Sequence, residues 1–147
     1  MTAKRRPGPA RAADFVTAQR SGRAPDRIAL IERIRAGLPY REVAEAAAAV
    51  HVNVKDLADF GIIPQRTLSH SKKTGRFTQA QSDRVARFFR VWQTASETFG
   101  HPDKARAWMM RPTRPLGGRA PVTLLDTEEG ARLVEDLLLR IDHGLAA

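Results

Sequence analysis

The spacing of apolar residues between Thr78 and Gly100 constrains the fold more than any other feature of this sequence. Large apolar side chains recur there every three or four positions, which places them on one face of an α-helix. The residues on this face are Val85, Phe88, Phe89, Trp92, Ala95 and Phe99. Thr78 and Gln81 have the spacing of a capping box, and Gly100 is a natural helix stop. The sequence therefore predicts a long helix with one apolar face.

Helical signals continue on both sides of this segment, and no convincing alternating strand pattern or internal repeat accompanies them. The expected helices run from Pro25 to Gly37, from Pro39 to Val50, from Val54 to Phe60 after an N-cap at Asn53, from Pro64 to Gly75, from Pro102 to Met109, and from Glu128 to His143 after an N-cap at Asp126. In the last helix Leu133, Val134, Leu137, Leu138 and Ile141 are expected to point inward. Residues 111–121 contain many helix breakers and predict a loop. The fold class is all-α.

The charge of the chain is strongly positive and unevenly distributed. The formal net charge is +9, which favours an anionic partner, most commonly nucleic acid. Residues 64–90 carry seven basic side chains against one acidic one, and residues 1–25 carry six against one. Residues 101–147 carry seven of each and are neutral. The excess charge therefore lies in an N-terminal arm and one central segment, and the partner of the C-terminal third is not selected by bulk charge.

Several classes of protein are disfavoured by composition. The chain has no cysteine, and its four histidines have no metal-ligand spacing, so neither a metal nor a cofactor is expected. No phosphate-binding loop, nucleophile elbow or paired-carboxylate motif appears, which disfavours an enzyme. No apolar run approaches the length of a membrane span, and the basic start lacks the apolar core of a secretory signal. We expect a cytoplasmic protein.

The central basic segment has the pattern of a helix-turn-helix. A helix at 53–60, a turn at Gly61 and a second helix from Pro64 would allow the second helix to enter the major groove. Leu68 would point inward, and the basic and polar side chains outward toward bases and phosphates. The candidate DNA-binding residues are Gln65, Arg66, Thr67, Ser69, Lys72, Lys73 and Arg76. A polar helical domain without DNA contacts is the alternative. An RNA partner is disfavoured because the segment lacks aromatic stacking platforms.

Several runs of residues resemble one known family. Residues 61–68 and 75–84, followed by 107–112, 116–121, 124–130 and 140–144, are similar to the Xre/MbcA/ParS antitoxins in order and spacing. The resemblance implies a partner toxin of the RES-domain type, which acts on NAD. It also implies repression of the chain's own operon by binding operator double-stranded DNA, and a homodimer within a larger toxin–antitoxin complex.

We expect three parts: a basic arm at 1–24, which lies outside the resemblance, a helix-turn-helix domain at 25–99 and a toxin-binding domain at 100–147. Within the last, the broken loop and the end of the final helix are the candidate contacts, since loops and arginines are favoured at recognition sites. The candidate toxin-binding residues are Trp108, Arg111, Pro112, Arg114, Leu116, Gly117, Gly118, Arg140, His143, Gly144 and Leu145. Two alternatives remain. The chain could be a stand-alone regulator whose C-terminal domain only dimerises, and the arm either contacts DNA or only aids solubility.

Overall fold

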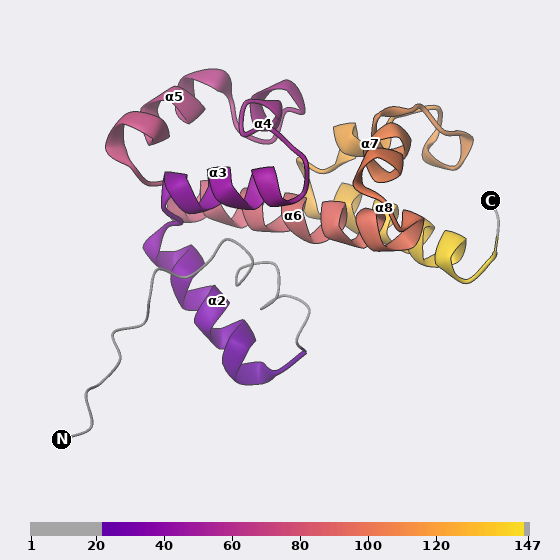
Figure 1. Cartoon of the computed structure of the whole chain (residues 1–147), viewed down its shortest axis with the longest axis horizontal. Helices are drawn as coiled ribbons and strands as arrows, with labels where there is room; N and C mark the ends of the chain where they lie inside the picture. The colour runs from indigo at the N-terminus through magenta and orange to yellow at the C-terminus, as the bar shows by residue number, and fades with distance from the viewer. Residues whose placement is uncertain (1–21, 146–147) are drawn as a thin grey trace.

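The computed structural model describes residues 22–145, and within that range it contains helices and no strand (Figure 1). Its elements are α2 (Ala24–Ala36), α3 (Tyr40–Ala49), α4 (Asp56–Asp59), α5 (Gln65–Thr74), α6 (Gln79–Phe99), α7 (Pro102–Met110), the 3-10 helices η1 (Arg114–Leu116) and η2 (Pro121–Leu124), and α8 (Glu128–Asp142). The all-α class expected from the apolar spacing is confirmed. The expected arm lies outside the described residues except for its last three positions. None of the described helices is both long and apolar enough to cross a membrane.

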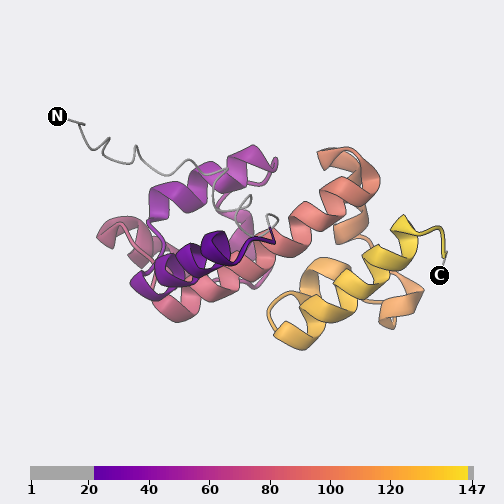
Figure 2. The same cartoon turned by 90° about the horizontal axis from the view of Figure 1, so that it is seen from below.

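Helix α6 is the central element of the molecule. Its 21 residues give it a length of about 31 Å at the usual helical rise. The capping box at its start is complete: the Thr78 hydroxyl accepts a hydrogen bond from the Gln81 backbone, and the Gln81 side chain accepts one from the Thr78 backbone. Helices α3, α4 and α5 lie at one end of α6 and α7 and α8 at the other, in both views (Figures 1 and 2). This long helix therefore separates two groups of elements while packing against both.

One hydrophobic core extends through both groups. Trp92 of α6 is fully buried, stacks on Phe60 with ring centroids 5.7 Å apart, and lies 5.3 Å from Phe88. The same cluster of buried residues includes Leu68 of α5 and Leu138 of α8. The expected boundary between residues 99 and 100 falls where α6 ends, yet the buried face of α6 contributes to the packing on both sides of it.

Three local expectations were wrong. Thr127, not Asp126, caps α8, because the Thr127 hydroxyl accepts the Gly130 backbone hydrogen bond. Leu133 is 49% exposed, because α8 buries only the arc of its surface that faces α6 and η2. The helix expected at 54–60 covers only Asp56–Asp59, and Asn53 accepts a hydrogen bond from the Lys55 backbone in the turn before it.

Gly130 marks the closest approach between α8 and the chain before it. A Cβ atom at this position would lie 1.8 Å from the Leu124 carbonyl oxygen. We therefore expect Gly130→Ala to push α8 away from η2 and to lower the free energy of unfolding by about 1–3 kcal/mol. Urea denaturation measures this change. Glu129→Ala, at the exposed neighbouring position, is the control, and equal stability of the two variants would contradict the prediction.

Candidate functional site

Residues 56–74 fold as two helices joined by a tight turn. Gly61 has a φ of 73°, the left-handed conformation that a glycine adopts without strain. The Ile62 and Ile63 backbones donate hydrogen bonds of 2.9 and 3.1 Å to the Leu57 carbonyl, and both side chains are fully buried. On α5, Leu68 and Ser71 point into the core. The turn and these buried contacts fix which face of α5 is directed outward.

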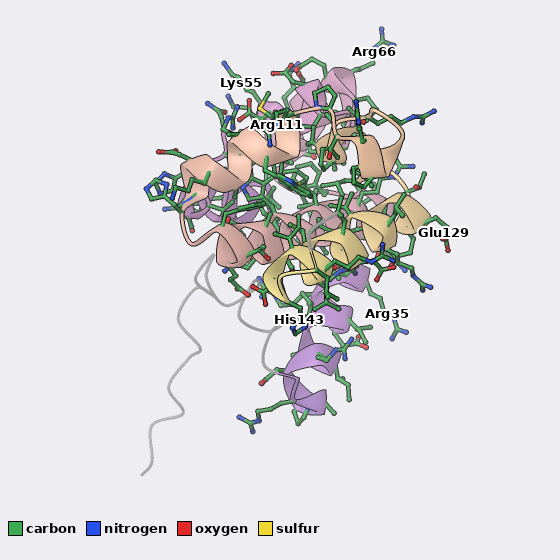
Figure 3. All side chains as sticks on the ribbon, turned by 90° about the vertical axis from the view of Figure 1, so that its right-hand side faces the viewer. Arg35, Lys55, Arg66, Arg111, Glu129 and His143 are labelled. Carbon is green, nitrogen blue, oxygen red and sulfur yellow. The ribbon has the colours of Figure 1, made fainter. Side chains whose placement is uncertain are left out.

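The outward face of α5 is polar and basic. The side chains of Gln65, Arg66, Ser69, Lys72 and Lys73 are exposed, and Thr67 is half-buried. Arg66 points away from the body of the molecule at its edge (Figure 3). The Gln65 amide donates a hydrogen bond of 3.4 Å to the Ser69 hydroxyl, one helical turn along. The structure thus gathers six of the seven predicted DNA-binding residues on one helix that carries no acidic side chain.

Arg76, the seventh predicted residue, has a structural role. Its guanidinium donates hydrogen bonds to the carbonyls of Gly37, at 2.6 Å, and Ala36, at 3.5 Å. Carbonyls at a helix C-terminus lack partners within the helix, so Arg76 satisfies the end of α2. Glycine at position 37 also allows the Phe77 carbonyl to lie close to the end of α2, because a Cβ there would lie 2.2 Å from the Phe77 carbonyl oxygen. Arg76 therefore holds the end of α5 against the end of α2.

Two arginines of the basic central segment lie on α6. They bind the C-terminal elements and are not part of the exposed basic face of α5. Arg87 donates hydrogen bonds to the carbonyls of Leu125, at 3.3 Å, and Asp126, at 2.9 Å. Arg90 binds Glu135 through its Nε at 2.8 Å and Glu128 through its Nη2 at 3.2 Å. These contacts connect α6 to the segment that begins α8. Sequence reasoning missed them because the partners lie about 40 positions apart in separate segments.

Arg90 stays charged in this network. Burial alone would lower the pKa of its guanidinium, but the hydrogen bonds and negative charges of Glu135 and Glu128 outweigh that effect, and the pKa is raised. A second link joins the two ends of the molecule, since Arg106 of α7 pairs with Asp56 of α4 at 3.2 Å and lies over the Phe60 ring. The positive charge of residues 64–90 is therefore divided between the exposed face of α5 and the arginines of α6, Arg87 and Arg90, that bind the C-terminal elements.

The loop of residues 111–121 presents arginines on a fixed backbone. The backbones of Thr113 and Gly118 close it with hydrogen bonds to Arg119 and Thr113, at 3.2 and 3.0 Å. Gly117 and Gly118 both have positive φ, and the side chains of Arg111, Pro112 and Arg114 are exposed. Leu116 is 5% exposed and packs into the core, so it anchors the loop and offers no contact surface. Trp108 is half-buried, with its ring centroid 5.4 Å from that of Phe99.

The end of α8 supplies the remaining predicted contacts. Arg140, His143, Gly144 and Leu145 are exposed, and the Leu145 backbone donates a 2.8 Å hydrogen bond to the Arg140 carbonyl. His143 and Arg111 both lie at the end of the molecule that faces the viewer in Figure 3, toward opposite edges. The loop and the end of α8 thus share one end of the molecule, and α5 lies at the other (Figure 1).

Comparison with known proteins assigns a family to each half. Residues 29–90 match a model described as the antitoxin Xre-like helix-turn-helix domain. Residues 94–144 match the antitoxin Xre/MbcA/ParS C-terminal toxin-binding domain. The chain belongs to the Xre/MbcA/ParS family of antitoxins. The order expected from the sequence, a helix-turn-helix followed by a small helical domain, is confirmed. The first match ends and the second begins within α6.

Individual relatives carry names of the same kind. A protein named antitoxin Xre from Yersinia enterocolitica is 46% identical over 56% of this chain and 57% of its own length. One of the same name from Photorhabdus laumondii is 49% identical over half of each chain. A Sphingobium protein named Prs ADP-ribosylating antitoxin is 28% identical over 83% of this chain and 81% of its own. The chain spans about half the length of the Yersinia and Photorhabdus relatives.

Proposed function

We propose that this chain is a type II antitoxin that represses its own operon through α5 and neutralises a RES-domain toxin through its C-terminal end. The observation that carries the proposal is the placement of the two candidate surfaces at opposite ends of α6 (Figure 1). A toxin bound at one end leaves the outward face of α5 free. The chain acts in this scheme as a binding protein, without catalysis of its own, and as a homodimer.

On DNA, the side chains of α5 take two roles. Gln65 and Arg66 lie in the first turn of the helix, where residues of a recognition helix reach base edges. Lys72 and Lys73 lie in the last turn, where their ammonium groups pair with phosphates. Arg76 contributes indirectly, because its hydrogen bonds to α2 position the helix.

Toward the toxin, the neutral C-terminal domain works through shape and a few placed charges. The exposed arginines at 111, 114 and 140 are suited to carboxylates around the mouth of an active site. The name of the Sphingobium relative refers to ADP-ribosylation, a reaction whose ADP-ribose comes from NAD. This chemistry agrees with a RES-domain partner that acts on NAD.

Operator binding tests the DNA half of the proposal. We expect Arg66→Ala to weaken binding to a duplex containing the chain's own promoter by about 1–3 kcal/mol and to reduce discrimination against unrelated DNA. Lys72→Ala should weaken binding to both duplexes alike and reduce the slope of log K against log salt by about one. Fluorescence anisotropy over a salt series measures both effects.

Arg111→Ala is the matched control for that experiment, because it removes an exposed arginine at the far end of the molecule. It should bind the promoter duplex as the parent does. If Arg66→Ala also binds as the parent does, α5 is not the recognition helix. Co-expression with the product of the neighbouring gene, followed by affinity capture, tests the toxin half, and a neighbour that is neither toxic nor captured would favour a stand-alone regulator.

A further inference from the structure

Helix α2 leaves an apolar stripe uncovered. Of its 13 residues only Leu30 is buried, whereas Ile28 is 57% exposed and Ile31 is 45% exposed. The helix crosses α6 and projects beyond the body of the molecule, as two views show (Figures 1 and 3). A helix of this length is marginal in water without packing partners. The exposed stripe is therefore a surface that a partner is expected to cover.

The spacing on α2 is that of a coiled-coil seam. Ala24, Ile28 and Ile31 follow each other at steps of four and three residues, which places Ile28 at an a position and Ile31 at a d position of a heptad. Arg27 then occupies the g position, and Glu32 occupies the following e position. In a parallel pair of such helices, the g residue of one helix lies beside the e residue of the next heptad in the other helix.

In one of the two possible orientations, the charges on one α2 helix are complementary to those on the α2 helix of a second copy. In a parallel two-fold pair, Arg27 of each copy faces Glu32 of the other, so both contacts are attractive. In an antiparallel pair Arg27 would face Arg27 and Glu32 would face Glu32, which is repulsive. Glu32 also pairs with Arg35 of its own helix at 2.9 Å, but this contact is exposed and contributes little.

A cavity beside the seam leaves one side of Ile31 uncovered. It has a volume of about 320 Å³ and lies between α2, α6 and the start of α8. Its α2 wall includes Leu30, Ile31 and Ile34, and its other walls include Arg87 and Arg90. Asp83 and Glu128 also line it, and they pair with Arg87 and Arg90, so Arg27 is the lining arginine left for the Glu32 carboxylate of a second copy.

From the exposed stripe, the heptad spacing and these charges, we propose that α2 pairs in parallel with α2 of a second copy of this chain, through Ile28 and Ile31, with Arg27 and Glu32 setting the orientation. The inference deepens the proposed homodimer by naming its surface, and it rests on that proposal. It leaves α5 and the C-terminal surface of each copy outside the contact.

Sedimentation equilibrium on the full chain tests the apolar part. Ile28→Ser with Ile31→Ser should raise the dimer Kd by at least about a hundredfold, because four isoleucines leave the interface. Leu133→Ser, at a similarly exposed leucine of α8, should leave the Kd unchanged. Far-UV circular dichroism should be the same for all three proteins, since each substituted side chain is exposed.

Charge-reversal substitutions and disulfide cross-linking test the parallel orientation of the two α2 helices. Arg27→Glu and Glu32→Arg should each weaken the dimer, and the two together should restore it, which only the parallel pairing predicts. Because the chain has no cysteine, Ile28→Cys alone gives a clean readout: it should form a disulfide-linked dimer under mild oxidation much faster than Leu133→Cys. Faster cross-linking between Ile28→Cys and Ile31→Cys copies would indicate antiparallel pairing and overturn the proposal.

The remaining outcomes separate this inference from the function on which it rests. A wild-type chain that is monomeric at about 100 μM, well above the Kd of a specific dimer, would overturn both the seam and the homodimer. A dimer that survives Ile28→Ser with Ile31→Ser would overturn the seam alone. Loss of that dimer on deletion of residues 1–21 would then assign the contact to the arm.

Discussion

A chain carrying Arg114→Glu and Arg140→Glu will bind its operator as the parent does and will fail to protect cells from the toxin. Both side chains are exposed, one on the loop after α7 and one in the last turn of α8, and neither has an ion-pair partner among the described residues. The reversal therefore leaves the fold intact. It places two like charges opposite the acidic groups expected on the toxin, and we expect the complex to weaken by at least about a hundredfold.

Growth after toxin induction, with the antitoxin supplied from a second promoter, measures protection, and anisotropy on the promoter duplex measures operator binding. Arg41→Glu with Arg84→Glu is the matched control, since it makes the same change in net charge at exposed positions of α3 and α6. The control should protect fully. Full protection by the Arg114→Glu, Arg140→Glu chain would remove these arginines from the toxin interface, whereas loss of operator binding as well would indicate a damaged fold.

Helix ends and long apolar stripes were the features that the sequence predicted best, because both depend on residues that lie close together along the chain. The capping box of Thr78 and Gln81 and the apolar face of α6 required nothing beyond local spacing. The capping of α8 was predicted one residue too early. Asp126 and Thr127 are both good N-caps, and only the path of the backbone decides which side chain reaches Gly130.

The direction in which a helix faces could not be predicted in the same way. Ile28, Ile31 and Ile34 recur at helical spacing, yet of these three only Ile34 packs against the core, because α2 meets α6 through the face that carries Leu30 and Ile34. Leu133 was expected to point inward for the same reason and does not. Spacing fixes the phase of a helix but not the arc that its neighbours cover.

The role of each basic side chain in the candidate sites was equally hard to predict from the sequence. Summing the basic residues of 64–90 predicted a nucleic-acid surface there, and α5 does present one exposed basic face. The sum also included Arg76, Arg87 and Arg90, whose guanidinium groups bind carbonyls and carboxylates within the chain. Only the folded structure distinguishes a cation available to a phosphate from one that holds two segments together.

Replacing Trp92 with alanine will abolish operator binding and toxin neutralisation together at 37 °C. The Trp92 ring is fully buried and contacts Phe60 of the helix-turn-helix side as well as Phe88 of α6, so its loss opens a cavity in the core shared by both ends of the molecule. Large-to-small changes of this kind cost about 3–5 kcal/mol, which in a chain of this size lowers Tm on the order of 10 °C or more.

Trp92→Phe tests whether lost packing accounts for the effect of Trp92→Ala. The indole Nε1 of Trp92 is buried with no hydrogen-bond partner among the described residues, so a phenyl ring gives up no hydrogen bond and leaves only a small gap. We expect it to cost roughly 1–2 kcal/mol and to retain both activities. Calorimetry of each protein should show one unfolding transition, because α6 belongs to the packing of both halves. Two separate transitions, or a Trp92→Ala chain that keeps one activity and loses the other, would show that the halves are independent units joined by a helix.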